Sequence, residues 1–314
     1  MTKLLVVFGI TGEQGGSVAN HFLSIPGWNT RGITRNPSST LSLSWSQKGI
    51  QLVYADLNDL STLPTALQGA TAIFAVTNFW EPFYNPNTAS LLKEGQNTNQ
   101  YCYEQEIQQV KNIADAAAHV AALERLVLSS SCDVSKWSGG KYSWVYHFDS
   151  KARGEVYLRE NYLELAGKTS VIHIGSYMNN WKENLHFRKA GDGTVRLATL
   201  KGTSEKPRPQ IETARDTGAL VHAALEAPAG KRILGVGSSI SWEDQFRTWC
   251  RIHGLEYGGF DEVTLEQFEM FMPIPGLGRE IGEMMLFEDE FRYCGGEKGV
   301  VFPEDLGVSC TMTS

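Results

Sequence analysis

The chain has 314 residues, which suits one large core or two unequal lobes better than a string of small domains. Its 42% apolar and 20% charged residues are typical of a folded globular protein and exclude disordered, collagen-like and coiled-coil chains. Lysine and arginine total 28 against 35 aspartates and glutamates, so the net charge is −7. This balance argues against a dedicated nucleic-acid surface, because phosphate binding needs a basic field.

The N-terminal apolar run and the cysteines indicate the cellular compartment. The run from Leu4 to Phe8 stops at Gly9, too short for the core of an export signal or for a membrane span. The cysteines stand apart with no Cys-x-x-Cys pair, which is typical of reduced thiols rather than of a disulfide framework or a zinc site. We therefore expect a cytoplasmic protein with no membrane partner. The cysteines are Cys102, Cys132, Cys250, Cys294 and Cys310.

Short apolar runs alternate with helical patterns in the first three quarters of the chain, which predicts a parallel sheet with crossover helices. The predicted strands are residues 4–9, 30–34, 51–54, 71–76, 125–129, 171–174 and 232–236. Helical spacing of apolar residues predicts helices at 107–117, after Lys151, and at 241–253, where Ser241 can cap the N-terminus.

The alternation breaks in two later stretches that carry glycine, proline and bulky aromatic residues. We therefore expect a dinucleotide-binding domain of residues 1–174, completed by about 211–240, and a smaller C-terminal α/β lobe. This lobe would comprise residues 175–210 and 241–314, fold over one end of the sheet, and take a substrate or a partner.

A glycine-rich turn, Gly9-Ile10-Thr11-Gly12-Glu13-Gln14-Gly15, joins the first predicted strand to a helix. In this context glycines allow a tight turn, a close approach of bare backbone to a pyrophosphate, and close packing of helix on strand. The helix N-terminus near Gln14 also favours phosphate. We expect a dinucleotide here, and a turn without a ligand is the alternative. The expected contacts are Gly9, Thr11, Gly12, Gln14 and Gly15.

The end of the second predicted strand distinguishes the two dinucleotides. NAD-selective sites usually place a carboxylate there for the ribose hydroxyl, but this strand ends Thr34-Arg35-Asn36-Pro37. The fork of donors on Arg35 suits a 2′-phosphate, which favours NADP(H), and a solvated surface arginine is the alternative.

The next two strand ends predict further cofactor contacts. Asp56, beside Leu57, stands where such folds place an acceptor for the adenine amino group. Thr77 and Asn78 follow the fourth predicted strand and would border the nicotinamide ribose. Asn78 could equally be a turn residue that bonds its own backbone.

Four motifs together resemble the NmrA-like branch of the atypical short-chain dehydrogenase/reductases, and in particular its NADP(H)-sensing subgroup. They are the glycine turn, Thr34-Arg35-Asn36-Pro37, Val76-Thr77-Asn78-Phe79-Trp80-Glu81 and His147-Phe148-Asp149-Ser150-Lys151. The likeness covers residues 1 to about 240. It implies a Rossmann-like, doubly wound domain, a smaller C-terminal lobe, and a cleft between them. Some members are regulators that bind dinucleotide without turnover, whereas others in the wider group reduce C=C, C=N or ketone bonds.

The resemblance also implies catalytic positions. Short-chain dehydrogenases use Tyr-x-x-x-Lys, and this chain keeps Lys151, which would hold the nicotinamide ribose, but has His147 in place of tyrosine. The spacing of four puts both side chains on one helical face. An imidazole can act as a general acid, although a nearby ammonium favours its neutral form. A packed helix histidine and a snorkelling surface lysine are the alternatives.

Ser130, within the run Ser129 to Ser131, lies where the superfamily offers a hydroxyl to the substrate, although serine is also common at strand ends. Tyr177 and Asn180 follow the sixth predicted strand, a segment that the family uses to roof the cleft. Together with Trp80 they are the expected substrate contacts. Neither the histidine spacing nor the serine context predicts a metal site or a hydrolase. The aromatic and methionine side chains that could form cleft walls, or simply pack in a core, are Trp80, Phe83, Tyr84, Trp137, Trp144, Phe271 and Met272.

Two functions remain open. Retention of the nicotinamide end of the site favours an NADPH-dependent reductase of a small apolar or aromatic substrate. Histidine in place of tyrosine favours a non-catalytic NADP(H) sensor that regulates a protein partner. The sequence is also compatible with a homodimer, and we expect no nucleic-acid partner.

Overall fold

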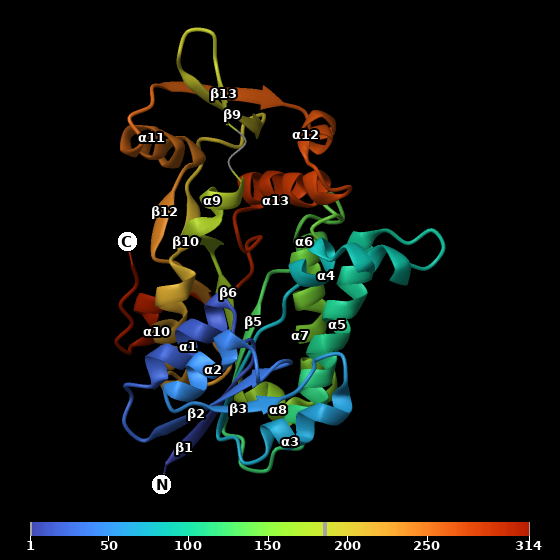
Figure 1. Cartoon of the computed structure of the whole chain (residues 1–314), viewed down its shortest axis with the longest axis vertical. Helices are drawn as coiled ribbons and strands as arrows, with labels where there is room; N and C mark the ends of the chain where they lie inside the picture. Colours follow the sequence, from blue (N-terminus) through green and yellow to red (C-terminus); the bar gives the residue numbers. More distant parts are fainter. Residues whose placement is uncertain (1, 185–186, 314) are drawn as a thin grey trace.

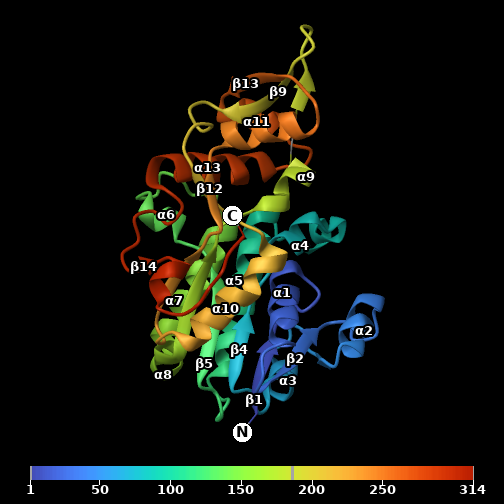
Figure 2. The same cartoon turned by 90° about the vertical axis from the view of Figure 1, so that its left-hand side faces the viewer.

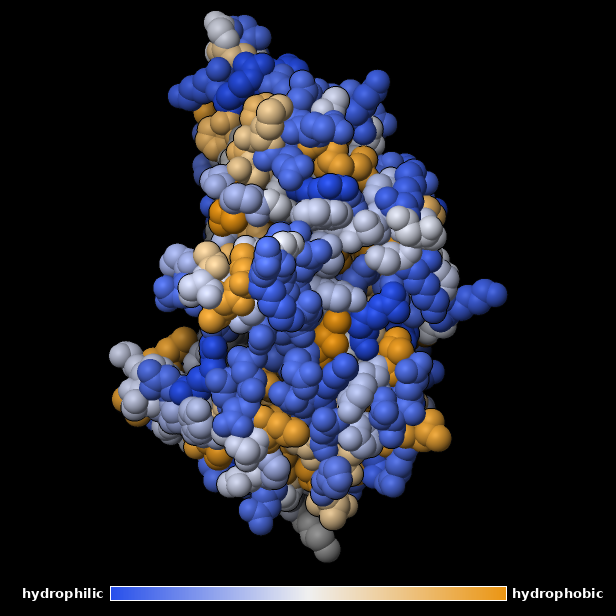
Figure 3. Space-filling view, turned by 90° about the vertical axis from the view of Figure 1, so that its right-hand side faces the viewer, coloured by the Kyte–Doolittle hydropathy of each residue, from blue (hydrophilic) through white to orange (hydrophobic). Residues whose placement is uncertain are grey.

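The computed structural model describes residues 2–184 and 187–313. A large parallel sheet with its helices forms the lower part of the molecule in Figure 1, and most of the C-terminal elements lie above it. On the face drawn in Figure 3, apolar side chains lie in small groups among hydrophilic ones, as is usual for a protein surface.

The large sheet has eight strands in the order β14-β11-β6-β5-β4-β1-β2-β3, and all its neighbouring strands are parallel. The seven predicted strands are confirmed, and β14 is an addition. The chain order reverses between β1 and β4, which opens a crevice at the carboxyl ends of these strands. The strands are β1 (Lys3–Val7), β2 (Trp28–Thr34), β3 (Gln51–Tyr54), β4 (Ala72–Ala75), β5 (Arg125–Ser130), β6 (Thr169–Ile174), β11 (Arg232–Gly235) and β14 (Val300–Val301).

Both faces of this sheet are covered, because alternate side chains of the central strands are apolar on each face. Leu5 and Val7 pack in a core with α1 and α10, whereas Val6 and Phe8 pack in a second core with α5. Figure 2 shows α1 and α10 side by side. The expected doubly wound α/β fold is thus confirmed. The helices of this part are α1 (Glu13–Phe22), α2 (Thr40–Gln47), α3 (Leu63–Leu67), α4 (Trp80–Tyr84), α5 (Thr98–Ala117), α6 (Val134–Trp137), α7 (Tyr146–Asn161), α8 (Leu163–Lys168) and α10 (Thr213–Glu226).

Within the described residues, two three-stranded sheets and four helices complete the upper part. The first sheet has the order β12-β10-β7 and the second β13-β9-β8. The strands are β7 (Ser176–Tyr177), β8 (Phe187–Lys189), β9 (Val195–Leu200), β10 (Arg208–Ile211), β12 (Ser238–Ile240) and β13 (Tyr257–Val263). The helices are α9 (Trp181–Asn184), α11 (Trp242–Ile252), α12 (Leu265–Phe271) and α13 (Leu277–Phe291).

Helices α11 and α13 differ in how well the sequence predicts them. The predicted cap of α11 is confirmed, because Ser241 accepts a hydrogen bond from the amide of Asp244. Helix α13 has no counterpart among the predicted helices. Three of its glutamates, Glu280, Glu283 and Glu288, are buried, so they interrupt the apolar stripe that would reveal a helix.

The end of the chain returns to the large sheet. Strand β14 pairs with β11, and Cys310 and Met312 pack against the core formed with α1 and α10. The hydroxyl of Thr313 donates to Asp216 at 2.7 Å. The two-domain division stays a prediction, with residues 300–301 lying in the large sheet. Within the described residues, no helix is long and apolar enough to cross a membrane.

Candidate functional site

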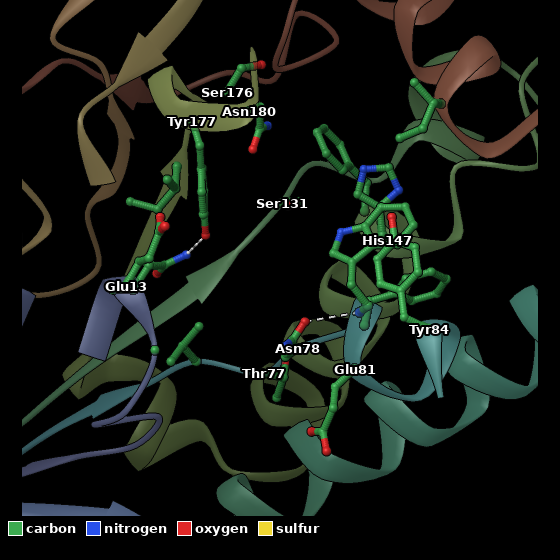
Figure 4. Close-up of a pocket in the computed structure, with 18 of the residues that line it drawn as sticks. Glu13, Thr77, Asn78, Glu81, Tyr84, Ser131, His147, Ser176, Tyr177 and Asn180 are labelled. Atoms are coloured by element: carbon green, nitrogen blue, oxygen red, sulfur yellow. Dashed lines mark hydrogen bonds between the residues drawn. The ribbon is translucent and has the colours of Figure 1, made fainter. Parts of the chain in front are cut away.

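A cavity of about 1280 Å³ lies at the carboxyl ends of the central strands and extends below the C-terminal elements. Figure 4 shows part of its lining, with Tyr177 and His147 on opposite walls. All the residues predicted for the site line this one cavity, while their individual roles stay predictions. They are Gly9, Thr11, Gly12, Gln14, Gly15, Arg35, Asp56, Leu57, Thr77, Asn78, Trp80, Ser130, His147, Lys151, Tyr177 and Asn180.

The glycine turn has the geometry of a bare backbone cradle. Gly9 has φ +64°, a conformation that favours glycine, and its carbonyl accepts from the amide of Gly12 at 2.9 Å. A Cβ on Gly15 would lie 2.2 Å from the carbonyl oxygen of Gly9, so α1 can pack this close only with glycine there. The turn from Gly9 to Gly15 and the start of α1 line the cavity, and close-packed backbone at a helix N-terminus fits a diphosphate.

Arg35 is held across the mouth of the crevice by Glu81. The guanidinium Nη1 lies 2.7 Å from Glu81 Oε1, and both side chains are about half exposed. Since β2 and β4 flank β1, this ion pair passes over the end of β1. Arg35 therefore lies at the cavity with a partner that an incoming phosphate would have to replace. Asp56 lines the cavity nearby and accepts from the amide of Asn58 at 2.9 Å.

The loop after β4 has a structural role in addition to its place on the cavity wall. Asn78 Oδ1 accepts from the amide of Trp80 at 3.0 Å, drawn as a dashed line in Figure 4, so this residue forms the turn that the sequence left open. The hydroxyl of Thr77 donates to Glu106 at 2.7 Å and is therefore directed towards a buried carboxylate.

Lys151 is anchored by Glu106 on α5. Its ammonium lies 2.7 Å from Glu106 Oε1 and 3.1 Å from the carbonyl oxygen of His147. The carboxylate of Glu106 is almost fully buried and also accepts from Ser150. An ammonium has three donors, so one remains for a ligand in the cavity.

The sequence analysis did not single out Glu106, although its position next to a predicted helix indicated a buried carboxylate. It lies one turn before Val110 on the buried face of α5, and a carboxylate on an apolar helix face needs a partner.

His147 is held by a second carboxylate, that of Glu280 on α13. Nδ1 and the backbone amide of His147 both lie within hydrogen-bond distance of Glu280 Oε1, at 2.6 and 2.8 Å. The ring packs against Trp80 with centroids 4.9 Å apart. The expected influence of the Lys151 ammonium on the charge of His147 stays a prediction. In the structure Glu106 pairs with that ammonium and Glu280 faces the imidazole.

The opposite wall carries Tyr177 and Gln14. Gln14 Nε2 donates to the hydroxyl oxygen of Tyr177 at 2.8 Å. Burial raises the pKa of Tyr177, so the phenol stays neutral and its proton is available to a further acceptor. Gln14 Oε1 is buried and has no hydrogen-bond partner among the described residues. An unpartnered acceptor on the glycine turn fits a ligand that supplies a donor.

Apolar side chains line the end of the cavity below the C-terminal elements, together with the charged Arg188 and Asp261. Trp80, Tyr84, Phe271 and Met272 line the cavity as the sequence suggested. The other three expected wall residues do not: Phe83 and Trp137 pack in clusters beside it, and Trp144 lies under the guanidinium of Arg279. Further apolar side chains at this end are Leu197, Phe260, Val263, Phe268, Leu277, Ile281, Met284 and Met285.

The pKa of Asp149, which lies between His147 and Lys151 in the sequence, predicts how the stability of the fold depends on pH. Burial raises its pKa from 3.8 to about 6, although it accepts from the amide of Val134 at 2.7 Å. Because the pKa is higher in the folded state, the stability gained from protonation is full below about pH 4 and is lost as the pH rises through about 6. Two pKa units correspond to at most about 3 kcal/mol.

We expect Asp149→Asn, which keeps an acceptor for Val134, to gain free energy of unfolding relative to the unsubstituted protein as the pH rises from 4 to 7. Urea unfolding at several pH values measures this difference. A difference that does not vary with pH would contradict the assignment.

Several known proteins are similar to this chain in sequence. The model of the NmrA-like family matches residues 1–312. The NmrA-like family domain-containing oxidoreductase cpsB of Aspergillus campestris is 28% identical over 236 residues, covering 72% of this chain and 64% of that protein. The chain thus matches less than two thirds of the length of this curated relative.

Two solved structures share the fold. The negative transcriptional regulator Nmra in complex with NADP has a TM-score of 0.67 at 20% identity, covering 99% of this chain and 88% of its own. The triphenylmethane reductase of Citrobacter sp. complexed with NADP(H) has a TM-score of 0.66 at 15% identity, covering 98% and 96%. The implied Rossmann-like fold is thereby confirmed.

Proposed function

The chain belongs to the NmrA-like family, and we propose that it binds NADP(H) and reduces a small apolar or aromatic substrate at a C=C, C=N or C=O bond. The observation that carries the proposal is a single cavity that joins the glycine turn, a carboxylate-bound histidine and an apolar chamber. The oxidoreductase names of relatives and the NADP(H) complexes of two structural neighbours support it.

The residues present fit the cofactor. The cradle of Gly9 to Gly15 and the start of α1 would hold the diphosphate, Arg35 the 2′-phosphate, and the remaining donor of Lys151 a ribose hydroxyl. When bound, NADPH supplies the hydride, and the protein contributes orientation and charge.

The side chains of the protein would orient the substrate and supply the proton. The apolar end of the cavity would orient the substrate and exclude water. His147 would hold a proton at Nε2 and pass it to the substrate atom that becomes basic on reduction. The hydroxyls of Ser130 and Tyr177, which also line the cavity, would hold the substrate's polar atoms.

A second candidate function is a redox-sensing module, which the Arg35–Glu81 pair favours. This pair ties the loop after β2 to α4, the helix that also carries Trp80. A 2′-phosphate that captured Arg35 would release α4 and change the surface that a protein partner meets. Such a sensor works only if the partner distinguishes the two states. The negative transcriptional regulator Nmra, solved in complex with NADP, shares the fold and supports a regulatory role.

Cofactor titration tests the part that both functions share. We expect Arg35→Ala to weaken NADPH binding roughly 10- to 100-fold, the value of one charge-assisted hydrogen bond, and to leave NADH binding nearly unchanged. Fluorescence quenching or calorimetry measures both affinities. The matched variant Glu81→Gln removes the competitor of the phosphate and should bind NADPH at least as tightly as the unsubstituted protein. Equal losses for NADPH and NADH would contradict the assignment of Arg35.

Turnover separates the two functions. The enzyme should consume NADPH stoichiometrically with a member of a panel of enones, imines and quinones, and His147→Ala should slow this reaction. No turnover across the panel, together with NADPH-dependent capture of a protein partner, would favour the sensor.

A further inference from the structure

We infer that Glu280 is a positioning residue that determines which ring nitrogen of His147 carries the proton. By holding Nδ1, it leaves Nε2 to face the substrate. The inference rests on the proposed function for its consequence. Its structural part concerns only the chain itself and can be tested without a substrate.

The hydrogen bonds of Glu280 show which groups its carboxylate holds in place. Its side chain is fully buried, and it accepts hydrogen bonds at both oxygens. Oε1 faces the amide and Nδ1 of His147, and Oε2 accepts from Asn99 Nδ2 at 2.7 Å. An ionised carboxylate can only accept, so Nδ1 of His147 carries the proton when Glu280 is ionised. The carboxylate also lies in the first turn of α13, where the helix dipole stabilises a negative charge.

The role of the other ring nitrogen, Nε2, follows by elimination. No described residue forms a hydrogen bond with Nε2 of His147, and the residue lines the cavity. In the neutral ring Nε2 carries a lone pair towards the cavity, and in the imidazolium it carries a proton there. This arrangement matches a general acid held by a carboxylate at its other nitrogen.

Among the described residues, the other charged groups near the ring have partners of their own, whereas Glu280 faces the imidazole. Lys151 on α7 pairs with Glu106 on α5. Glu288 on α13, which also interacts with His147, pairs with Arg208 of β10. In the proposed reduction the Nε2–H bond breaks, its electron pair stays on the ring, the proton joins the substrate, and solvent restores it.

Helix α13 therefore supplies part of the site although it lies in the C-terminal part of the chain. Asn99, which holds Glu280, also donates to the carbonyl of Gly276 at the start of α13. Gly276 has φ +82°, a conformation that favours glycine, and a Cβ there would lie 2.1 Å from Asn99 Oδ1, so the Asn99 side chain would have to move away from Glu280. The orientation of His147 thus depends on the docking of α13.

Glu283 provides a matched control. It lies one turn further along α13, is also buried, and accepts from the amides of Ser143 and Trp144, each at 2.8 Å. It therefore anchors the residues just before α7, next to the His147 amide that Glu280 binds, without contacting the ring. Loss of backbone anchoring alone should appear equally in variants of either glutamate.

The test combines ¹⁵N NMR of histidine-labelled protein with kinetics. His147→Gln assigns the ring signals by their loss. We expect a proton on Nδ1, in the neutral ring and in the imidazolium alike, in the unsubstituted protein, in Glu283→Gln, and in Glu280→Gln, whose amide oxygen still accepts. Glu280→Met, which removes the acceptor, should shift the signals towards the Nε2–H tautomer.

Turnover should fall roughly 10- to 100-fold in Glu280→Gln, because the counter-charge is lost, while NADPH affinity and turnover of Glu283→Gln stay within about twofold. A lone pair on Nδ1 in the unsubstituted protein, an unchanged tautomer in Glu280→Met, or equal losses of turnover in Glu280→Gln and Glu283→Gln would overturn the inference. If the tautomer results hold and no substrate is turned over, the positioning role stands and the proposed reductase function fails.

Discussion

Replacement of Gly15 by alanine is expected to abolish measurable NADPH binding and to destabilise the fold. The added Cβ would lie 2.2 Å from the carbonyl oxygen of Gly9 and 2.6 Å from that of Phe8, and both are backbone atoms that no side-chain rotation can move. The turn must therefore open, which misplaces the amides that would face the diphosphate. Loss of two charge-assisted hydrogen bonds corresponds to about 3–6 kcal/mol, more than 100-fold in affinity. Overpacking costs a further 1–3 kcal/mol or so of folding stability.

Gly16→Ala is the matched control for this prediction. It adds the same methyl group one residue further along α1, where the nearest atom is Trp45 Cζ2 at 3.4 Å, an ordinary contact. Alanine also suits a helix better than glycine, by about 0.5–1 kcal/mol. We expect this variant to bind NADPH within about twofold of the unsubstituted protein and to melt no lower. Titration and thermal unfolding of both variants measure the contrast, and equal behaviour would show that the close approach of α1 does not matter.

The cofactor end of the cavity was predictable because its determinants are local. Lys151, on α7, was predicted from the resemblance rather than from the order of strands. The glycine turn lies between an apolar strand and a helix, and the order of strands then places Arg35 and Thr77 at one end of the sheet. These positions follow from topology alone, since the carboxyl ends of parallel strands meet at that end. Each of these residues lines the observed cavity.

The partners of these residues were not predictable, because they depend on packing between distant segments. Glu280 reaches His147 across 133 positions of sequence from a helix whose apolar stripe is interrupted by buried carboxylates. Glu81 reaches Arg35 only because β2 and β4 flank β1. Sequence periodicity reports which face of a helix is apolar but not which buried charge it meets. In the sequence His147 was therefore only a histidine in place of the family's tyrosine. In the structure its Nδ1 faces the carboxylate of Glu280.

Lys151→Met is expected to lower both stability and turnover, and the two losses have separate causes. The substitution leaves Glu106 buried with the hydroxyls of Thr77 and Ser150 as its donors among the described residues. Removal of one partner of a buried ion pair costs about 3–5 kcal/mol, because the remaining charge is uncompensated. The same change removes the donor proposed for the nicotinamide ribose. Urea unfolding and NADPH consumption measure the two losses independently.

The double variant Glu106→Gln with Lys151→Met separates these causes. A neutral amide at position 106 no longer needs a cation, and its oxygen still accepts from Thr77 and Ser150, so most of the lost stability should return. Turnover should stay as low as in Lys151→Met, because no group replaces the ammonium in the cavity. If turnover recovered along with stability, Lys151 would only neutralise Glu106, and its proposed contact with the cofactor would be wrong. If stability did not recover, the cost would lie in the packing of the methionine rather than in the uncompensated charge of a buried carboxylate.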